Sequence, residues 1–317
     1  IAVTDIDGVL RGKVIHKDKF LSVLNKGFGF CDVVFGWDCS DSLYDNVQFT
    51  GWHTGFPDTN AKVDLNTFRK IPWDNDLPFF IADFRDEKDA PLPICPRNLV
   101  KKINKQAIDA GYLPFFSQEF EWFNFNETPQ SLYKKNFDNI EPITPGMFGY
   151  SILRSSFPIL EIQEKPNSKK PSLRLRSGQA NTKAKPAQTF FNNIFDWLNS
   201  YNVPLEGLHT ETGPGVYEAA IQYSHILEAA DRAVLFKTAV KEIAYRHEVV
   251  ASFMAKWNMN LPGCGGHIHQ SLWNTQETKN LFFDPKSKYN MSEIMKSYVA
   301  GQLYCLPHLL PMYAPTI

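Results

Sequence analysis

The stretch GCGGHIHQSL, residues 263–272, places two histidines one position apart behind three glycines and a cysteine. His267 and His269 flank Ile268, and side chains two positions apart share one face of a β-strand. The pattern predicts a strand that carries both imidazoles on one face, approached by the bare backbone of the glycines. Such a strand is either a ligand site or an ordinary polar sheet edge.

Glutamates alternate in the same way in SQEFEWFNF, residues 117–125. Glu119 and Glu121 are separated by Phe120, so both carboxylates should project from one face of a strand. Paired glutamates on a strand are usually a solvated face. Carboxylates buried among Phe120, Trp122 and Phe123 would instead be costly unless a cation neutralised them.

A third stretch is GLHTETGPGVYEAAI, residues 207–221, in which Glu211 and Glu218 flank a Gly-Pro-Gly turn. That turn can fold the second glutamate back beside the first. The residues named in these three stretches are four glutamates, together with His267 and His269, all on strand-like segments. Sets dominated by carboxylates with an imidazole favour Mg²⁺ or Mn²⁺ over zinc, and pairs of such ions serve phosphoryl transfer.

The composition is that of a globular protein with more than one domain. The 317 residues are 43% hydrophobic and 21% charged, and 25 phenylalanines predict an aromatic-rich core. A formal net charge of -1 gives no general attraction to nucleic acid or to an anionic membrane. Five scattered cysteines without a C-x-x-C pair, and no visible signal peptide or membrane span, predict a cytoplasmic protein.

The first ninety or so residues are predicted to form strands and loops. A hairpin is expected over residues 1–15, further strands over 27–38 and 77–84, and a loop over 38–60 whose length suggests a functional role. The later elements expected are a helix at 96–111, a strand at 114–125, helices at 189–200 (capped by Thr189) and 223–247, and a helix capped by Ser292.

Residues 161–188 differ in composition from the rest of the chain. They are rich in Lys, Arg, Pro, Ser, Asn and Gln and almost devoid of large apolar side chains, which predicts a flexible basic insertion. Nucleic-acid binding is the weaker interpretation, because the segment lacks interleaved aromatic residues.

Seven stretches in this order resemble the glutamine synthetase family, and the resemblance covers nearly the whole chain apart from the insertion. The stretches are TDIDGVLRGK, TFRKIPW, CPRNLVKKI, SQEFEWFNF, HTETGPGVYEAAI, SFMAKWNMNLPGCGGHIHQSLW and LPHLLPMYAPTI. The fifth and sixth are more similar to a divergent branch of the family, which includes γ-glutamyl-amine ligases.

The resemblance implies an α+β fold. A small β-grasp N-terminal domain, residues 1–93, would precede a catalytic domain, residues 94–317, built on a curved antiparallel sheet with flanking helices. It also implies a homo-oligomeric ring, a dodecamer in the full-length parent, in which the N-terminal domain of one subunit closes the active site of its neighbour. The implied reaction forms γ-glutamyl phosphate from glutamate and ATP, and ammonia then attacks it.

The resemblance also implies residue roles. Glu121, Glu211 and Glu218 would hold one metal ion, and Glu119 and His267 a second, in a site of about two or three Mg²⁺ or Mn²⁺ ions. The other positions that match are His269, Ser271 and Tyr223 beside ATP, Gly263 and Gly265 in the glutamate-binding loop, and Asp38 and Ser40 near the ammonium site.

The chain also departs from the family pattern. It stops at YAPTI, before the segments that carry the family's arginines, its glutamate flap and its last metal ligand, so it is expected to be too short for catalysis. It would be a fragment truncated at both ends or a shortened, inactive paralogue. Pro262 replaces an asparagine of the glutamate site, which leaves open a ligase for a polyamine or another amine. A non-catalytic structural protein is the alternative of another class.

Overall fold

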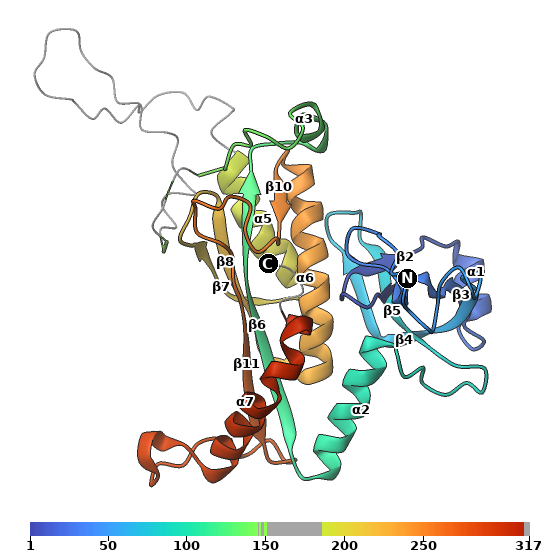
Figure 1. Ribbon diagram of the computed structural model, residues 1–317, viewed down its shortest axis with the longest axis vertical. Coiled ribbons are helices and arrows are strands. Elements are labelled where there is room, and N and C mark those ends of the chain that lie inside the picture. The colour runs from blue at the N-terminus through green and yellow to red at the C-terminus, as the bar shows by residue number, and fades with distance from the viewer. Residues whose placement is uncertain (145, 147–148, 151–185, 314–317) are drawn as a thin grey trace, which may run out of the picture.

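The computed structural model describes residues 1–144, 146, 149–150 and 186–313 (Figure 1). The N-terminal part contains a five-stranded sheet in the order β2-β1-β5-β4-β3. Its strands are β1 (Ala2–Thr4), β2 (Leu10–Gly12), β3 (Phe28–Cys31), β4 (Asp58–Ile71) and β5 (Leu77–Phe84). The helical elements are α1 (Lys17–Val23) and the short 3-10 helix η1 (Asp32–Phe35).

The predicted N-terminal hairpin is confirmed. β1 and β2 are antiparallel, and Asp5 closes the turn by accepting the N–H groups of Asp7 and Val9 at 3.0 and 2.8 Å. Three expectations were wrong. Residues 17–23 form a helix, and β4 begins at Asp58, inside the predicted loop. The strand expected over 27–38 ends at Cys31, because residues 32–35 turn into the 3-10 helix η1. β4 is held by its long pairing with β5, a contact that local residue patterns do not reveal.

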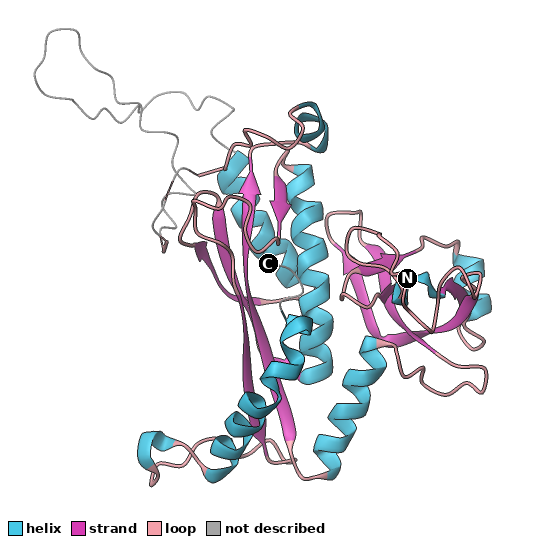
Figure 2. Cartoon of the chain, viewed as in Figure 1, coloured by secondary structure: helices cyan, strands magenta, loops and turns pink. Residues whose placement is uncertain are grey.

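The second sheet has the order β10-β6-β8-β7, and β9 and β11 also pair with β6. Its strands are β6 (Leu113–Phe125), β7 (Leu205–Thr210), β8 (Val216–Ile221), β9 (Ser224–His225), β10 (Val250–Ser252) and β11 (Gly266–Trp273). Figure 2 shows the long strands of this curved sheet with helices along one side. The helical elements are α2 (Pro96–Asp109), α3 (Pro129–Lys134), α5 (Pro186–Ser200), α6 (Ile226–Arg246), η2 (Lys288–Asn290) and α7 (Glu293–Tyr313).

Aromatic side chains attach the sheet to α6. Phe120 and Trp122 of β6 contact Phe236 of α6, with ring centroids 5.7 and 5.6 Å apart. Phe190 of α5 joins the same buried cluster. The predicted aromatic-rich core is therefore confirmed, and it covers one face of the sheet.

The N-terminal sheet contacts α6 from the side away from the second sheet, as Figure 1 shows. Buried Arg97, at the start of α2, donates to Asp83 of β5 at 2.7 Å and to Asp231 of α6 at 2.8 and 2.9 Å. Its contact with Asp64 of β4 is 3.0 Å long. One guanidinium thus joins two strands of the N-terminal sheet to α6, and removing a buried partner of this kind typically costs about 3–5 kcal/mol.

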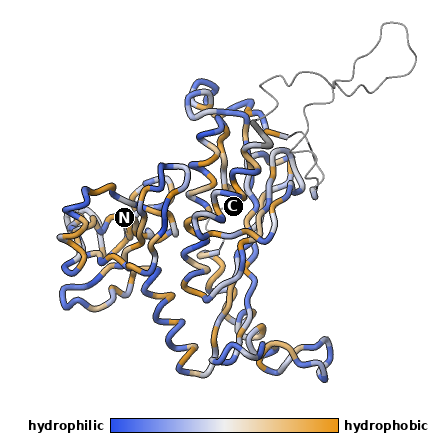
Figure 3. Tube along the Cα trace, turned by 180° about the vertical axis from the view of Figure 1, so that it is seen from behind, coloured by the Kyte–Doolittle hydropathy of each residue, from blue (hydrophilic) through white to orange (hydrophobic). Residues whose placement is uncertain are grey.

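The predicted helices are present, with two differences at their starts, since α6 begins three residues later than expected, at Ile226, and α5 three residues earlier. α5 begins at Pro186, so Thr189 lies inside the helix and is not its cap. Proline suits a first helical position because it has no N–H to leave unpaired. Ser292 does cap α7, since its Oγ accepts the Met295 N–H at 3.1 Å. The apolar stripe of α2, which alternates in colour in Figure 3, is half-exposed at Leu99 and Ile103.

Most of the predicted basic insertion, residues 161–185, lies outside the described residues. Only residues 186–188 of that segment are described, as the first turn of α5. Among the described helices, none is both long enough and apolar enough to cross a lipid bilayer.

Candidate metal and nucleotide site

The glutamates of β6 lie on the sheet face that α6 leaves open. Phe120 and Trp122 turn towards α6, so the alternating Glu119 and Glu121 turn away from it. The two acids are therefore not buried among Phe120 and Trp122, which lie on the face that α6 covers. Phe123 shares the face of the two glutamates, because side chains two positions apart on a strand point to the same side, and it belongs to a separate small core cluster with Phe125 and Val216.

Strand pairing extends this acidic face over three strands. Glu121 of β6 pairs with Glu218 of β8, and Glu218 pairs with His209 of β7. The His209 Nε2 lies 3.5 Å from a Glu218 carboxylate oxygen. The result is one row of His209, Glu218 and Glu121 across the sheet.

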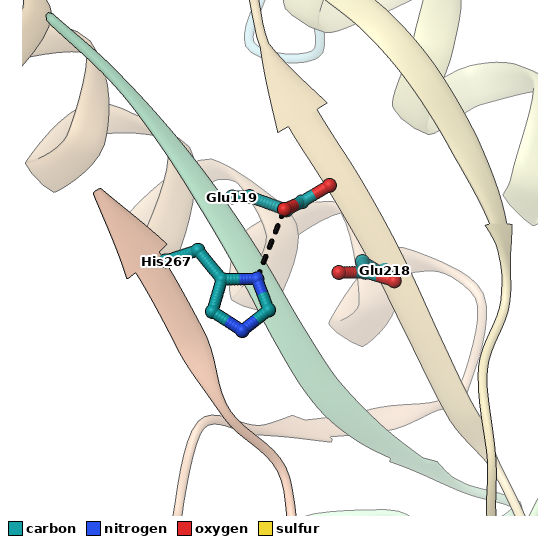
Figure 4. Close-up of side chains that lie close together, drawn as sticks. All are labelled: Glu119, Glu218 and His267. Carbon is teal, nitrogen blue, oxygen red and sulfur yellow. Dashed lines mark hydrogen bonds and ion pairs between the residues drawn. The ribbon is translucent and has the colours of Figure 1, made fainter. Parts of the chain in front are cut away.

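A second row begins on β11, where His267 pairs with Glu119. The Nδ1 of His267 lies 3.0 Å from the Glu119 Oε2, and the Nε2 of His269 lies 3.2 Å from the same oxygen. Figure 4 shows His267 bonded to Glu119 with Glu218 facing them from the neighbouring strand. Both histidines are well exposed, with 60% and 63% of their side chains accessible.

The Gly-Pro-Gly turn between β7 and β8 brings Glu211 back beside Glu218, as predicted. Gly215 has a φ of +72°, and a Cβ there would lie 2.4 Å from the Asn124 carbonyl oxygen, so only glycine fits. The Glu211 N–H donates to the carbonyl of Val216 at 2.9 Å, which closes the turn.

Two groups of side chains in the described part of the chain could each hold a divalent ion. Glu119, Glu218 and His267 form one, and His209, Glu211 and Glu218 the other, with one ligand atom per residue and all such atoms of a group within 4.8 Å of one another. Glu218 belongs to both. Carboxylate oxygens with single imidazoles are the donors that Mg²⁺ and Mn²⁺ accept.

The electrostatics of the face call for a cation. Burial, and then the charges of Glu119, Glu121 and Glu211, raise the pKa of Glu218, while His209 lowers it. The hydrogen bond from His267 is the largest cause of a lowered pKa at Glu119, and Glu119 in turn raises the pKa of His267. A divalent ion among these carboxylates would relieve the repulsion that raises the pKa of Glu218.

Glu121 belongs to neither group because the glycine loop holds it. The Gly265 N–H donates to the Glu121 Oε2 at 3.0 Å, and a Cβ at Gly265 would lie 3.2 Å from the other oxygen. A Cβ at Gly263 would lie 2.6 Å from the Ala255 carbonyl oxygen. The close approach of the loop's own backbone thus explains why residue 263 is a glycine, without any ligand.

Of the three residues predicted beside ATP, His269 and Ser271 lie on β11, and Tyr223 lies between β8 and β9. Ser271 Oγ accepts from the Trp273 indole at 3.1 Å, and the exposed Tyr223 meets the Phe115 ring edge at 5.8 Å. Phe115 also contacts His225, at 4.5 Å between ring centroids. Phe115 precedes Glu119 by four residues on β6, so both side chains point to the open face. The rings of Phe115, Tyr223 and His225 therefore lie further along the same face as the acidic side chains.

The structure does not bring Asp38 and Ser40 to this face. Asp38 Oδ1 accepts the N–H groups of Ser40 and Ser42 at 2.8 and 2.9 Å, within a loop of the N-terminal part. That part contacts α6, which covers the apolar face of the second sheet (Figure 1). Within one chain, the loop and the acids lie on opposite sides of the sheet.

Sequence reasoning did not single out His209 and Tyr150. The Tyr150 ring lies on the His209 ring with centroids 4.8 Å apart. His209 precedes Glu211 by two positions, and this spacing, which predicts a shared strand face, was the available signal.

Comparisons with known proteins agree with the geometry. The family model described as the glutamine synthetase catalytic domain matches residues 93–317. The chain is 51% identical to the type-1 glutamine synthetase 2 of Dictyostelium discoideum over 317 residues, which are 100% of this chain and 55% of that protein. It is 30% identical to the glutamate–isopropylamine ligase of a Pseudomonas species, with 100% of this chain and 63% of that protein covered.

A solved structure of a GmaS/ADP complex superposes with a TM-score of 0.73 at 20% identity, covering 100% of this chain and 62% of that one. The chain belongs to the glutamine synthetase family, and it spans between about half and two-thirds of the length of these relatives. The predicted α+β fold of this type is confirmed. The β-grasp type of the N-terminal sheet remains a prediction.

Proposed function

We propose that the polypeptide containing this chain uses ATP to join ammonia to the γ-carboxylate of glutamate through γ-glutamyl phosphate. The observation that carries the proposal is the pair of ligand groups that share Glu218 on the open face. Membership of the glutamine synthetase family and the 51% identity to a glutamine synthetase of Dictyostelium discoideum support the proposal. Phosphoryl transfer between two anions needs dense positive charge in a fixed geometry.

Glu119, Glu218 and His267 would hold one divalent ion, and Glu211 and Glu218 another, with Glu121 beside them. Such ions supply the positive charge that neutralises the phosphates and the developing charge at the reacting centre. Mg²⁺ and Mn²⁺ are the proposed ions. Glu119 keeps His267 oriented through their 3.0 Å contact, and the Gly265 amide fixes Glu121.

The remaining roles are assigned by position. Tyr223, Ser271 and His269 are proposed to bind the nucleotide, since Phe115 and Tyr223 offer ring surfaces beside the acidic face. The loop of Gly263 and Gly265 is proposed to meet glutamate. Asp38 and Ser40 are proposed to attract the ammonium cation in a neighbouring copy, because they lie away from the acids of their own chain.

A homo-oligomeric ring, with a dodecamer as its expected form, would supply that neighbour. We also propose residues 1–93 and 94–317 as the two domains, because Phe30, Phe35 and Phe84 belong to a core cluster separate from that of Phe190 and Phe236. A cytoplasmic location is proposed from the scattered free cysteines.

A second candidate reaction is ligation of a larger amine to glutamate. Pro262, in place of the family's asparagine, lies against the turn that holds Glu211, since a Cβ at Gly213 would be 3.7 Å from the Pro262 ring. The Pseudomonas relative is named for isopropylamine, which makes such amines reasonable substrates to test.

The test measures ADP release by the full polypeptide with ATP, Mg²⁺, glutamate, and either ammonium or one of a panel of amines. Glu218→Gln should lower the rate by about a hundredfold or more, because it weakens both ligand groups. Glu87→Gln, at an exposed position, is the matched control. If no amine elicits ADP release, the non-catalytic interpretation replaces the enzymatic one.

A further inference from the structure

We infer that His209 is a ligand of the metal ion held by Glu211 and Glu218, so that this ion has an imidazole among its donors. The inference rests on the proposed metal-dependent function and specifies the chemistry of one of its ions. None of the positions expected from sequence for the first ion is a histidine, since those are Glu121, Glu211 and Glu218.

The distances around His209 are those of ligands that share an ion. Its Nε2 is 3.5 Å from the Glu218 Oε2, and one ligand atom from each of His209, Glu211 and Glu218 lies within 4.8 Å of the other two. Ligands bound at about 2.1 Å lie about 3.0–3.5 Å apart in octahedral or tetrahedral geometry. The contact with Glu218 therefore suits two donors directed at one cation better than a short direct hydrogen bond.

The backbone favours the tautomer that a metal ligand requires. The His209 Nδ1 lies 3.2 Å from the carbonyl oxygen of Thr210. When Nδ1 donates its proton there, Nε2 presents a lone pair towards Glu218. A metal-bound histidine commonly gives its other N–H to a backbone carbonyl in this way, which fixes the ring.

Both carboxylates of the group have capacity for a cation. Glu211 Oε1 accepts the N–H and the hydroxyl of Thr212, each at 2.7 Å, whereas its buried Oε2 has no hydrogen-bond partner among the described residues. The Glu218 side chain is only 8% exposed. A buried carboxylate oxygen without a donor is costly, and a shared cation would satisfy it together with the His209 lone pair.

The surroundings hold the imidazole in place. The Tyr150 ring lies on it at 4.8 Å with an interplanar angle of 30°. Glu121 is engaged by the Gly265 amide, which leaves room for His209 beside Glu218. Because imidazole suits Mn²⁺ better than Mg²⁺, this ion should show a preference for Mn²⁺ over Mg²⁺.

The experiment titrates the chain with Mn²⁺ alone and records the nitrogen couplings of bound Mn²⁺ by pulsed electron paramagnetic resonance. His267→Gln, in the other ligand group, should leave one imidazole coupling. Adding His209→Gln to that variant should remove the coupling and weaken the remaining Mn²⁺ by about tenfold or more. His308→Gln, at an exposed position of α7, is the control and should change nothing.

A second variant, His209→Asn, keeps a donor for the Thr210 carbonyl while it removes the ring, and thermal melting checks that each variant folds. An unchanged nitrogen signal and affinity on adding His209→Gln to the His267→Gln variant would refute the inference. If Glu218→Gln abolishes Mn²⁺ binding in that case, the metal site of the proposed function still stands. Absence of Mn²⁺ binding to the parent chain would overturn both.

Discussion

Gly265 is the residue at which the loop ahead of the histidines meets the acidic face. Its N–H donates to Glu121 at 3.0 Å, and a Cβ at this position would lie 3.2 Å from the other carboxylate oxygen. A methyl group at this distance should turn the carboxylate, since real Cβ contacts are rarely so short. Gly265→Ala is expected to weaken Mn²⁺ binding by about tenfold, the size of effect typical of a residue that orients a ligand.

Isothermal titration with Mn²⁺ checks this prediction. Gly207→Ala is the control, because a Cβ there meets nothing within 4 Å. Equal affinities for the two variants would show that the position of Glu121 does not affect the metal ions.

At the same scale, the face shared by Glu119 and Glu121 was predictable from alternation alone. The sequence pattern did not predict which face of the sheet packs against a helix. That choice depends on Phe236, which contacts Phe120 and lies more than a hundred residues further along the chain. His209 was missed for a related reason. Its place beside Glu218 comes from the pairing of β7 with β8, and a single imidazole on a strand is most often structural.

Among the elements, β6 and α6 depend on each other. Phe236 is fully buried and contacts both Phe120 and Trp122 of the strand that carries the glutamates. Phe236→Ala should lower the free energy of unfolding by about 3–5 kcal/mol, the usual cost of an aromatic cavity. Denaturant unfolding measures the loss. Phe195→Ala, on the neighbouring helix and 40% exposed, should cost much less.

Element boundaries show where sequence patterns carry information. α2 was predicted closely, because it begins at Pro96 and ends just before Gly111. α6 was predicted to begin three residues too early, because Ser224–His225 pair with β6 as strand β9. The start of α5 was predicted three residues late, since Thr189 resembles a cap while Pro186 is the first residue of the helix. The helix α1 lies in a segment where charged residues obscure the helical period.

For the whole molecule, the cluster around Arg97 is expected to contribute to the response of the chain to acid. Burial alone would raise the pKa of Asp64, but the hydrogen bonds and charges of Lys101 and Arg97 lower it. A carboxyl with a lowered folded pKa contributes stability above its unfolded pKa of about 3.9, and this is lost as pH falls through the folded value. Asp64→Asn should therefore flatten the decline in stability between about pH 5 and about pH 2.

Urea unfolding at several pH values measures this slope. Asp109→Asn is the control, because it alters only an exposed pair with Lys105 at 2.6 Å. The pKa of Asp231 is raised, because burial raises it more than Arg97 lowers it. This shift is opposite in direction to that of Asp64, and it is present in both variants, so it does not affect the comparison. An unchanged slope for Asp64→Asn would mean that other carboxyls govern the acid response.

The histidine strand β11 pairs with β6 along one side, and no described strand pairs with its other side. Its residues His267 and Ile268 are exposed, so this margin of the sheet could recruit foreign strands. A cation bound by His267, Glu119 and Glu218 would link β11 to β6 and β8. Loss of divalent ions would then lower stability as well as activity. Without the bound ion, β11 would separate from β6 more often, and the exposed strand edges would promote aggregation.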